Sequence, residues 1–513
     1  MLTLIILSVV LAAGYFYCVK NYDYWKKLGV PYVQPVVIFG CMIDPFLRRR
    51  SMTELFVEWY KKYSDEKVVG LFEGTKPCLL IRDPELVKRV LITDFVSFHE
   101  RGIHPDQEGI EPLLSNLFFV EGDLWRSLRQ RMTPAFTSGK LKAMFPLIVE
   151  RAEKLQTRAL NAARQGKVID ARDLMARYTT DFIGACGFGL DADSLNEENS
   201  DFRELGKEIF RFDFMHGVKS VLKDLFPRFF RSVKFFGNIE NQVLSLVYNI
   251  QKQRNFQPSN RHDFIDLLME CQRKGPIEIE SLVKVKADGT PSRTIIEITD
   301  QLLAAQVFIF FAAGFETSSS STSYTLHQLA YNPEVLKKVQ KEIDKVLSKH
   351  DNKLSFEAVK EMTYLEWTFR EGMRMFPSLG YLSRMCTQKY TFPELDLTID
   401  KEVGIIIPLQ ALHMDPQYFE NPEEFRPERF DPENEKESNK YVYLPFGQGP
   451  RACIGERLGL MQSLAGLAAV LSKFDVTPAP ESKRVLDVKP QYDIVQNIAG
   501  GIPLLFKERK KVD

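Results

Sequence analysis

The stretch that decides the fold of this chain is a short loop near its C-terminus, Phe446-Gly447-Gln448-Gly449-Pro450-Arg451-Ala452-Cys453-Ile454-Gly455. Gly447 and Gly449 lack a Cβ atom, so the backbone can turn sharply and its N–H groups can approach the Cys453 sulfur. A helical pattern starts at Glu456, and the dipole of such a helix favours an anion at its N-terminus. These features suit a thiolate ligand of a haem iron. We therefore predict that Cys453 binds haem iron.

Two neighbours of Cys453 fit the same prediction. Phe446 can cover the sulfur, and the planar guanidinium group of Arg451 can pair with an anionic haem propionate. The alternative is a glycine-rich loop beside a buried structural cysteine. Other motifs at the expected places in the chain would make that alternative less favourable.

The loop resembles the haem-binding loop of the cytochrome P450 family, the haem-thiolate monooxygenases, and every family position in it is occupied. The resemblance implies haem b as the cofactor, with Cys453 as the metal ligand. It further implies that Phe446, Arg451 and Gly455 are cofactor-binding residues. It also predicts four other motifs in a set order.

The first of these motifs is Trp125-Arg126-Ser127-Leu128-Arg129. Trp125 and Arg129 are four residues apart on one helical face, so both side chains can reach the same target. The pair alone is weak, because a surface arginine beside a half-buried tryptophan is common. The resemblance implies that both residues bind a haem propionate.

The second motif lies in the longest predicted helix, from Thr299 to about Tyr331, which is uncharged from Gln301 to Phe315. Such a helix is expected to cross the protein interior. It contains Ala313-Gly314-Phe315-Glu316-Thr317, in which a mid-helix glycine and a buried carboxylate are both costly. A kinked core helix is the alternative interpretation.

The resemblance implies catalytic roles for four residues of this second motif. Ala313 and Gly314 leave room for dioxygen and substrate beside the iron. Thr317 assists the protonation of dioxygen, and Glu316 helps to feed protons from solvent. These roles would favour oxygen insertion over the release of peroxide.

The remaining motifs are predicted to be structural. Glu371 and Arg374 share a helical face and can form an ion pair. The resemblance adds Arg429, from Pro427-Glu428-Arg429-Phe430, to this pair. Between these motifs, Arg384 matches a further propionate-binding position.

Five motifs thus occur in family order between residues 125 and 455. The resemblance implies the triangular P450 fold, mainly α with small β-sheets (α+β), as a single catalytic domain. The stretches 132–141 and 310–317 are most similar to insect microsomal members. The run 175–188 is similar to moth and butterfly enzymes associated with plant toxins and insecticides.

Composition sets further limits. The chain of 513 residues has 68 basic and 68 acidic side chains, which argues against nucleic acid as a partner. Seven scattered cysteines without CxxC spacing argue against a disulfide framework or a zinc site, and they indicate a reducing compartment. The 38 phenylalanines suggest a chain that buries or contacts apolar matter.

The N-terminus predicts a membrane anchor. Leu2 to Val19 is an uncharged apolar run of 18 residues, just long enough to cross a bilayer as a helix. Lys20, Lys26 and Lys27 follow, so the positive-inside rule puts the catalytic domain in the cytoplasm. A cleaved signal peptide is the alternative, because Ala12-Ala13-Gly14 are small. We predict an anchor (1–20), a linker (21–40) and a haem-thiolate monooxygenase domain (41–513), at the endoplasmic reticulum membrane.

Local patterns predict several smaller elements. Met52 to Tyr63 is an amphipathic helix, and the apolar runs 68–72 and 78–81 are strands. Asp83 before Pro84 is a helix N-cap. The polar segment 284–293 is a surface loop. The aromatic-rich segment 210–230 corresponds to the part of the family that covers the active site and touches the membrane.

The implied activity is insertion of one oxygen atom of O2 into an apolar small molecule, such as a plant toxin or insecticide. Electrons come from NADPH through cytochrome P450 reductase, with cytochrome b5 as a further candidate donor. Arg126, Arg131, Lys140 and Lys142 form a basic cluster that could bind the donor, although a solvated face is the more common reason for such charges.

Three alternatives stay open. The substrate could be an endogenous hormone or lipid. The chain could be a haem-thiolate isomerase or dehydratase that does not use O2, which the Gly314 and Thr317 pair disfavours. It could also be a membrane-bound haem sensor or carrier.

Overall fold

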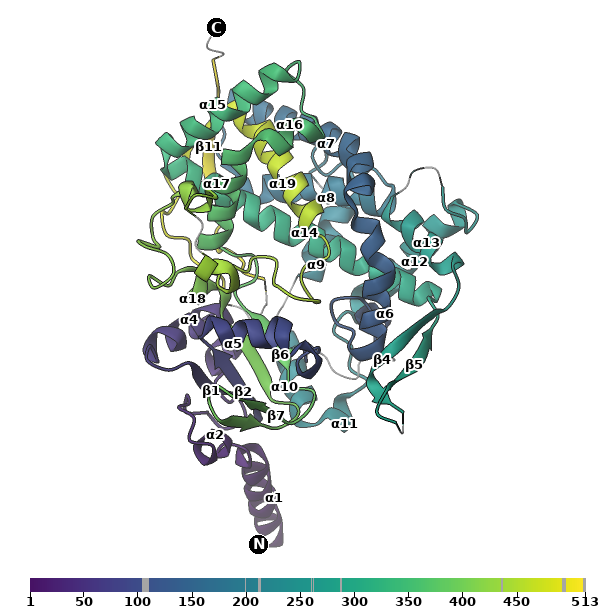
Figure 1. Cartoon of the computed structure of the whole chain (residues 1–513), viewed down its shortest axis with the longest axis vertical. Helices are drawn as coiled ribbons and strands as arrows, with labels where there is room; N and C mark the ends of the chain where they lie inside the picture. The colour runs from purple at the N-terminus through teal and green to yellow at the C-terminus, as the bar shows by residue number, and fades with distance from the viewer. Residues whose placement is uncertain are drawn as a thin grey trace.

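The computed structural model describes residues 1–103, 110–198, 200–210, 214–259, 261, 263–286, 288–434, 437–490 and 495–510. Helices dominate the body, a smaller part holds a mixed sheet, and one helix projects from it (Figure 1). The predicted fold class, mainly α with small β-sheets, is confirmed.

The α-helices of the described residues follow in chain order. They are α1 Leu2–Val19, α2 Tyr24–Lys27, α3 Ile43–Phe46, α4 Met52–Lys62, α5 Pro84–Lys88, α6 Gly122–Met132, α7 Ser138–Arg164, α8 Ala171–Ile183, α9 Asp201–Ile209, α10 Phe214–Leu225, α11 Pro227–Phe230, α12 Gly237–Gln253, α13 Phe264–Arg273, α14 Asp300–Tyr331, α15 Pro333–Lys349, α16 Phe356–Glu361, α17 Thr363–Met375, α18 Leu409–His413 and α19 Glu456–Leu471. Short 3₁₀ or π segments are η1 Arg89–Thr93, η2 Phe95–Ser97, η3 Pro112–Leu114, η4 Thr133–Phe136, η5 Gly184–Phe188, η6 Pro427–Phe430 and η7 Glu437–Tyr441.

The strands form small sheets. They are β1 Val68–Glu73, β2 Lys76–Ile81, β3 Ile169–Asp170, β4 Ile277–Val285, β5 Pro291–Ile296, β6 Leu382–Met385, β7 Tyr390–Phe392, β8 Leu397–Ile399, β9 Gly404–Ile407, β10 Phe474–Pro478 and β11 Pro503–Glu508. The largest sheet has the order β1-β2-β9-β6, in which β2 and β9 are parallel and the other pairs are antiparallel. The others are β10-β11-β3, β4-β5 and β7-β8.

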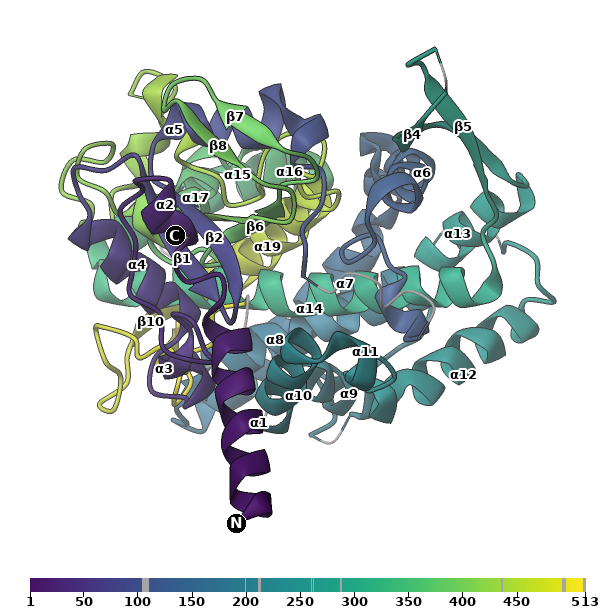
Figure 2. The same cartoon turned by 90° about the horizontal axis from the view of Figure 1, so that it is seen from below.

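Helix α14 crosses the middle of the body (Figure 2). Thr299 caps it as predicted, because its side-chain oxygen accepts the Leu302 N–H at 3.2 Å. The helix packs against α8, α17 and α19, and most of its side chains are buried. By length and composition it could also span a membrane, but its burial identifies it as a core helix.

The predicted structural ion pair is confirmed and lies in the core. Arg374 donates from Nε to Glu371 Oε2 at 2.7 Å and from Nη2 to Glu371 Oε1 at 2.9 Å. Arg429 joins through its Nε, 3.2 Å from Glu371 Oε1. The side chains of Glu371 and Arg374 are both 0% exposed. Through Arg429, Glu371 ties α17 to η6.

The N-terminal elements also match their predictions. Ser51 and Glu54 form a capping box at the start of α4, and Asp83 caps α5 with Pro84 in the first turn. Strands β1 and β2 lie at the predicted runs. The segment before them is packed against β1, because the buried Trp25 lies over Gly70 and donates from Nε1 to Leu71 O at 2.9 Å.

The predicted surface loop 284–293 is wrong in part. Strands β4 and β5 form an antiparallel hairpin that pairs as far as Val285 and Pro291. The hairpin is held by α6, whose Asp123 accepts the Leu282 N–H at 2.6 Å and the Ser281 hydroxyl at 2.7 Å. Polar composition suggested a loop because many side chains of both strands are exposed, and α6, which supports the hairpin, is distant in sequence.

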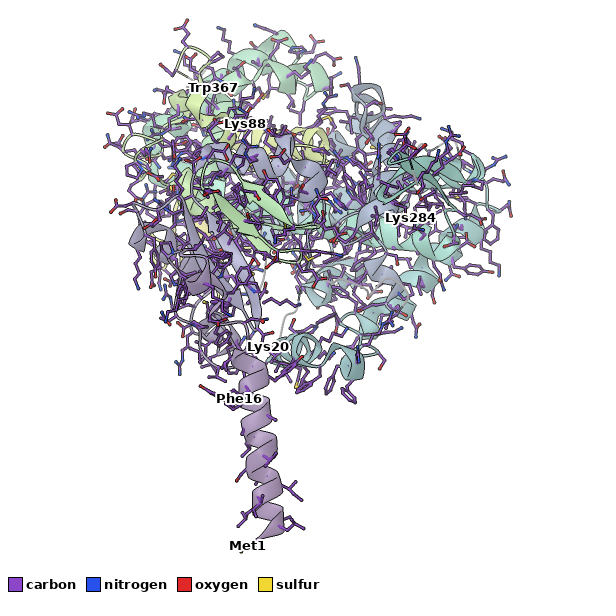
Figure 3. All side chains as sticks on the ribbon, turned by 60° about the horizontal axis from the view of Figure 1, so that its bottom comes forward. Met1, Phe16, Lys20, Lys88, Lys284 and Trp367 are labelled. Atoms are coloured by element: carbon purple, nitrogen blue, oxygen red, sulfur yellow. The ribbon has the colours of Figure 1, made fainter. Side chains whose placement is uncertain are left out.

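Helix α1 projects away from the body. Figure 3 shows it from Met1, past Phe16, to Lys20 at the junction with the body. The helix is apolar, uncharged and hardly buried, as the prediction of an N-terminal anchor requires. Its end touches the body through Tyr17, which donates to Leu225 O at 3.1 Å and stacks on Phe226.

We expect Arg374→Ala to destabilise the folded protein strongly. The substitution leaves the Glu371 carboxylate buried without its charge partner, which costs about 3–5 kcal/mol. That is a large share of a typical unfolding free energy of about 5–15 kcal/mol. Thermal unfolding followed by circular dichroism measures the effect.

The matched control is Lys338→Ala, which breaks an exposed ion pair with Glu428 at 2.7 Å. Exposed pairs contribute about 0–1 kcal/mol, so we expect little change. A stability loss no larger in R374A than in K338A would contradict a core role for the Glu371 pair.

Candidate functional site

The cysteine loop is closed by its own backbone. The Cys453 N–H donates to Phe446 O at 2.8 Å, and the Ala452 N–H donates to Gly449 O at 3.0 Å. Gly447 and Gly449 have φ angles of +70° and +75°, which disfavour other residues. A Cβ atom on Gly449 would lie 1.9 Å from Leu91 O. The two glycines are therefore required by the turn itself.

Cys453 lies just before α19, whose N-cap is Gly455. The other six cysteines are buried, whereas Cys453 is exposed. Protein nevertheless surrounds the thiol and raises its pKa by desolvation, so the side chain faces an internal space. The Gly455 backbone, Arg129 and Arg101 act in the opposite direction and favour the thiolate.

The second motif, like Cys453, has exposed side chains although it lies in the interior of the protein. On α14, Ala313 is exposed and Thr317 is half-buried, although Ala312, Phe315 and Glu316 are buried. Ala313 and Thr317 are four residues apart and share a helical face. Exposed positions in the middle of a core helix indicate that this face also borders an internal space.

Side-chain hydroxyls modify the backbone of α14 at this motif. Thr317 Oγ1 donates to Ala313 O at 2.7 Å, and Ser378 Oγ donates to Thr317 O at 2.9 Å. Such bonds compete with the helical ladder and bend a helix. Gly314 serves close packing with α8, because a Cβ atom there would lie 2.4 Å from Ile183 Cδ1.

The Glu316 carboxylate is not free in the interior. It forms a close ion pair with Arg172 of α8, whose Nη1 also donates to Ser319 Oγ at 2.7 Å. Arg172 further reaches Asn497 Oδ1 at 3.4 Å. The Glu316 side chain therefore extends from the hydroxyl-rich helix α14 to the partly exposed guanidinium group of Arg172.

Four arginines gather around the cysteine loop. Arg129 donates from Nη1 to Ala452 O at 2.8 Å, and the Arg451 guanidinium lies 4.4 Å from the Trp125 ring centroid. Arg384 is buried and donates from Nη1 to its neighbour Ser383 O at 2.7 Å. The structure thus brings the predicted cofactor-binding residues together.

The fourth member, Arg101, was missed by the sequence analysis. Its Nη2 lies 3.5 Å from Arg451 O, and its guanidinium stacks on Phe118 at 4.5 Å. Arg101 belongs to a loop rather than to a periodic element. For that reason no spacing rule could relate it to Cys453.

The arginine cluster calls for an anionic partner. Burial lowers the pKa of Arg451 and Arg384, and their neighbouring positive charges lower it further. Among the described residues, Arg101 Nε, Arg384 Nε and Arg451 Nη1 have no hydrogen-bond partner. Buried donors of this kind are costly unless an acceptor satisfies them. The carboxylates of haem propionates fit this requirement.

A single accessible thiol, guanidinium donors for an anion and a hydroxyl-bearing core helix define the class of haem-thiolate proteins. Cys453 would hold the iron, and Trp125, Arg101, Arg129, Arg384 and Arg451 would hold the propionates. When bound, haem supplies the activation of dioxygen, which a thiolate ligand promotes.

Comparisons with known proteins identify the family. The family model described as Cytochrome P450 matches residues 30–503. The chain is 36% identical over 507 residues to cytochrome P450 6B6 of Helicoverpa armigera, covering 99% of this chain and 98% of that protein. It is 37% identical to cytochrome P450 6a2 of Drosophila melanogaster, covering 98% of each. It is 37% identical to cytochrome P450 6B1 of Papilio polyxenes, covering 94% of this chain and 95% of that protein.

The chain belongs to the cytochrome P450 family. It is a monooxygenase with haem b as its cofactor, and it acts with O2 on a small molecule. The predicted family, enzyme class and cofactor are confirmed. The individual site roles stay predictions that rest on the contacts described above.

We expect Gly449→Ala to prevent thiolate ligation. The new Cβ atom would collide with Leu91 O, and the positive φ angle adds strain, so the loop has to open. The measurement is the Soret band of the reduced carbon monoxide complex, which should lose its thiolate-type red shift. Gly139→Ala is the control, because no atom lies within 4 Å of its Cβ position; an unaltered Soret band in G449A would refute the requirement.

We expect Arg384→Leu to release haem faster, by about ten- to a hundred-fold. The estimate follows from the loss of one hydrogen bond to a charged group, which contributes about 1.5–3 kcal/mol. Transfer of haem to excess apomyoglobin measures the rate. Arg151→Leu, which removes another buried arginine on α7, should transfer haem at the wild-type rate. Equal rates in the two variants would exclude Arg384 from the cofactor site.

Proposed function

We propose that this chain is a membrane-bound monooxygenase of the endoplasmic reticulum that oxidises apolar foreign compounds, such as plant toxins or insecticides. Electrons would come from NADPH through cytochrome P450 reductase. The observation that carries the proposal is the internal exposure of Cys453 together with the Ala313 and Thr317 face of α14. The similarity of the chain to moth and butterfly enzymes supports the proposed substrate class.

Two features support attachment to a membrane. The apolar helix α1 is long enough to cross the hydrocarbon. Tyr17 at the end of α1 contacts Leu225 and Phe226, at the junction of α10 and α11, and apolar side chains are exposed along this segment. They are Phe214, Met215, Phe226 and Phe229, the last of which is 83% exposed. A membrane surface would cover this patch while α1 anchors the chain.

The reductase proposal draws on the basic cluster near the cysteine loop. Arg126 donates to Glu280 O at 3.1 Å and Arg131 donates to Gly275 O at 3.1 Å, so both also hold the β4–β5 region. Reversing their charge would disturb folding as well as docking. Lys140, at the start of α7, is the cleaner position for a test of donor binding.

The residues of α14 suggest how protons are handled. Thr317 offers a hydroxyl on the internal face, and Glu316 with Arg172 links this helix to a partly exposed region. We infer that Thr317 orients the reacting oxygen species or a water molecule. Glu316 would pass a proton inward when its ion pair with Arg172 opens.

The test is turnover with a reductase. We expect NADPH consumption and O2 uptake to rise when a plant toxin or insecticide is added, with an oxidised product. Thr317→Ala should raise the ratio of NADPH consumed to product at least several-fold, because poorly directed proton transfer releases peroxide. Thr317→Ser should restore most of the coupling.

The control is Thr322→Ala on the same helix, where Thr322 Oγ1 donates to Ser318 O at 2.7 Å in the same manner. It should leave coupling unchanged. Turnover without O2 uptake would favour an isomerase or dehydratase. Oxidation of hormones or lipids but not of foreign compounds would replace the proposed substrate class.

A further inference from the structure

Glu121 lies where three segments of the cofactor site meet. Its Oε2 accepts the Arg451 Nη2–H at 2.7 Å, and its Oε1 accepts the backbone N–H groups of Arg101 at 2.9 Å and Gly102 at 3.0 Å. Glu121 itself directly precedes α6, which carries Trp125. One carboxylate thus joins the cysteine loop, the loop of Arg101 and helix α6.

A simple helix-capping role does not explain these contacts. Glu121 is the N-cap residue of α6, yet its side chain makes no hydrogen bond to the first turn of that helix. All of its described bonds go to other segments. The carboxylate therefore serves the junction of these segments rather than the helix behind it.

Positive charges outnumber negative charges at this junction. Arg101, Arg129, Arg384 and Arg451 surround the cysteine loop, and Glu121 is the carboxylate bound directly to Arg451. The Glu121 side chain is only 17% exposed, and burial raises its pKa to about 7. A buried carboxylate is costly, and the guanidinium of Arg451 and the two N–H groups offset that cost.

We propose that Glu121 is a positioning residue for the haem: it holds Arg451 and the Arg101 loop in place, and when ionised it supplies a negative charge to the propionate-binding cluster. With Glu121 bound to Nη2, Arg451 keeps Nη1 unpartnered and available to a propionate. The same carboxylate makes the surroundings of the haem less positive, which opposes the addition of an electron.

The test is the reduction equilibrium of the holoenzyme at about pH 8, where Glu121 is ionised. Glu121→Gln keeps the side-chain size and removes the charge. We expect the ferrous-to-ferric ratio at a fixed solution potential to rise about three- to ten-fold, and ten-fold corresponds to 59 mV for one electron. Haem transfer to apomyoglobin should also accelerate several-fold, because Arg451 and the Arg101 loop are held less firmly.

Two further variants complete the test. Glu100→Gln removes the same charge from a second nearby carboxylate, which acts on Arg451 through its charge and lies 3.6 Å from His99. It should shift the equilibrium less and leave haem transfer unchanged. Glu121→Asp keeps the charge but is too short to reach all three donors. It should have a nearly wild-type reduction equilibrium and faster haem transfer.

The proposal is overturned if E121Q shifts the reduction equilibrium no more than E100Q does. If E121Q does not retain haem, E121D decides, and haem transfer at the wild-type rate in E121D would then reject the positioning role. The Soret band of the carbon monoxide complex, recorded for each variant, reports thiolate ligation by Cys453 separately. Loss of that band in the wild-type protein would refute the haem-thiolate assignment itself.

Discussion

One constraint dominates this structure: a cysteine thiol must stay accessible inside a protein that otherwise excludes water. Water exclusion penalises the thiolate, so the protein supplies compensation from the Gly455 backbone and from nearby guanidinium groups. The closed turn from Phe446 to Cys453 holds the sulfur at the start of α19.

The guanidinium groups create a second requirement. Four arginines near one loop repel each other, and burial makes that repulsion stronger. Glu121 offsets part of it from within the chain, and two haem propionates would offset more. Arg101, Arg384 and Arg451 each keep a buried N–H donor without a hydrogen-bond partner. The side chains of the protein alone therefore do not satisfy the guanidinium groups of the site. Binding an anionic cofactor would complete it.

Two buried ion pairs have different places in this architecture. Glu371 and Arg374 are completely buried and bind each other at both oxygens, so they stabilise the core around α17. Glu316 and Arg172 connect the central helix to α8 near a partly exposed region. The first pair suits a permanent structural role, and the second is the one for which we propose a part in proton transfer.

The sequence by itself determined the family, the capped core helix and the ion pair of α17, and it predicted Cys453 as the iron ligand, because each depends on residues close together in the chain. Only the tertiary structure decided that Gly314 packs against Ile183, that Glu316 pairs with Arg172, and that segment 284–293 contributes to a hairpin. It alone also brought Arg101 and Glu121 to Arg451. The side-chain contacts join residues far apart in sequence, and the hairpin is held by Asp123 of α6, which is also distant in the chain. Periodicity and spacing carry information only over a few helical turns.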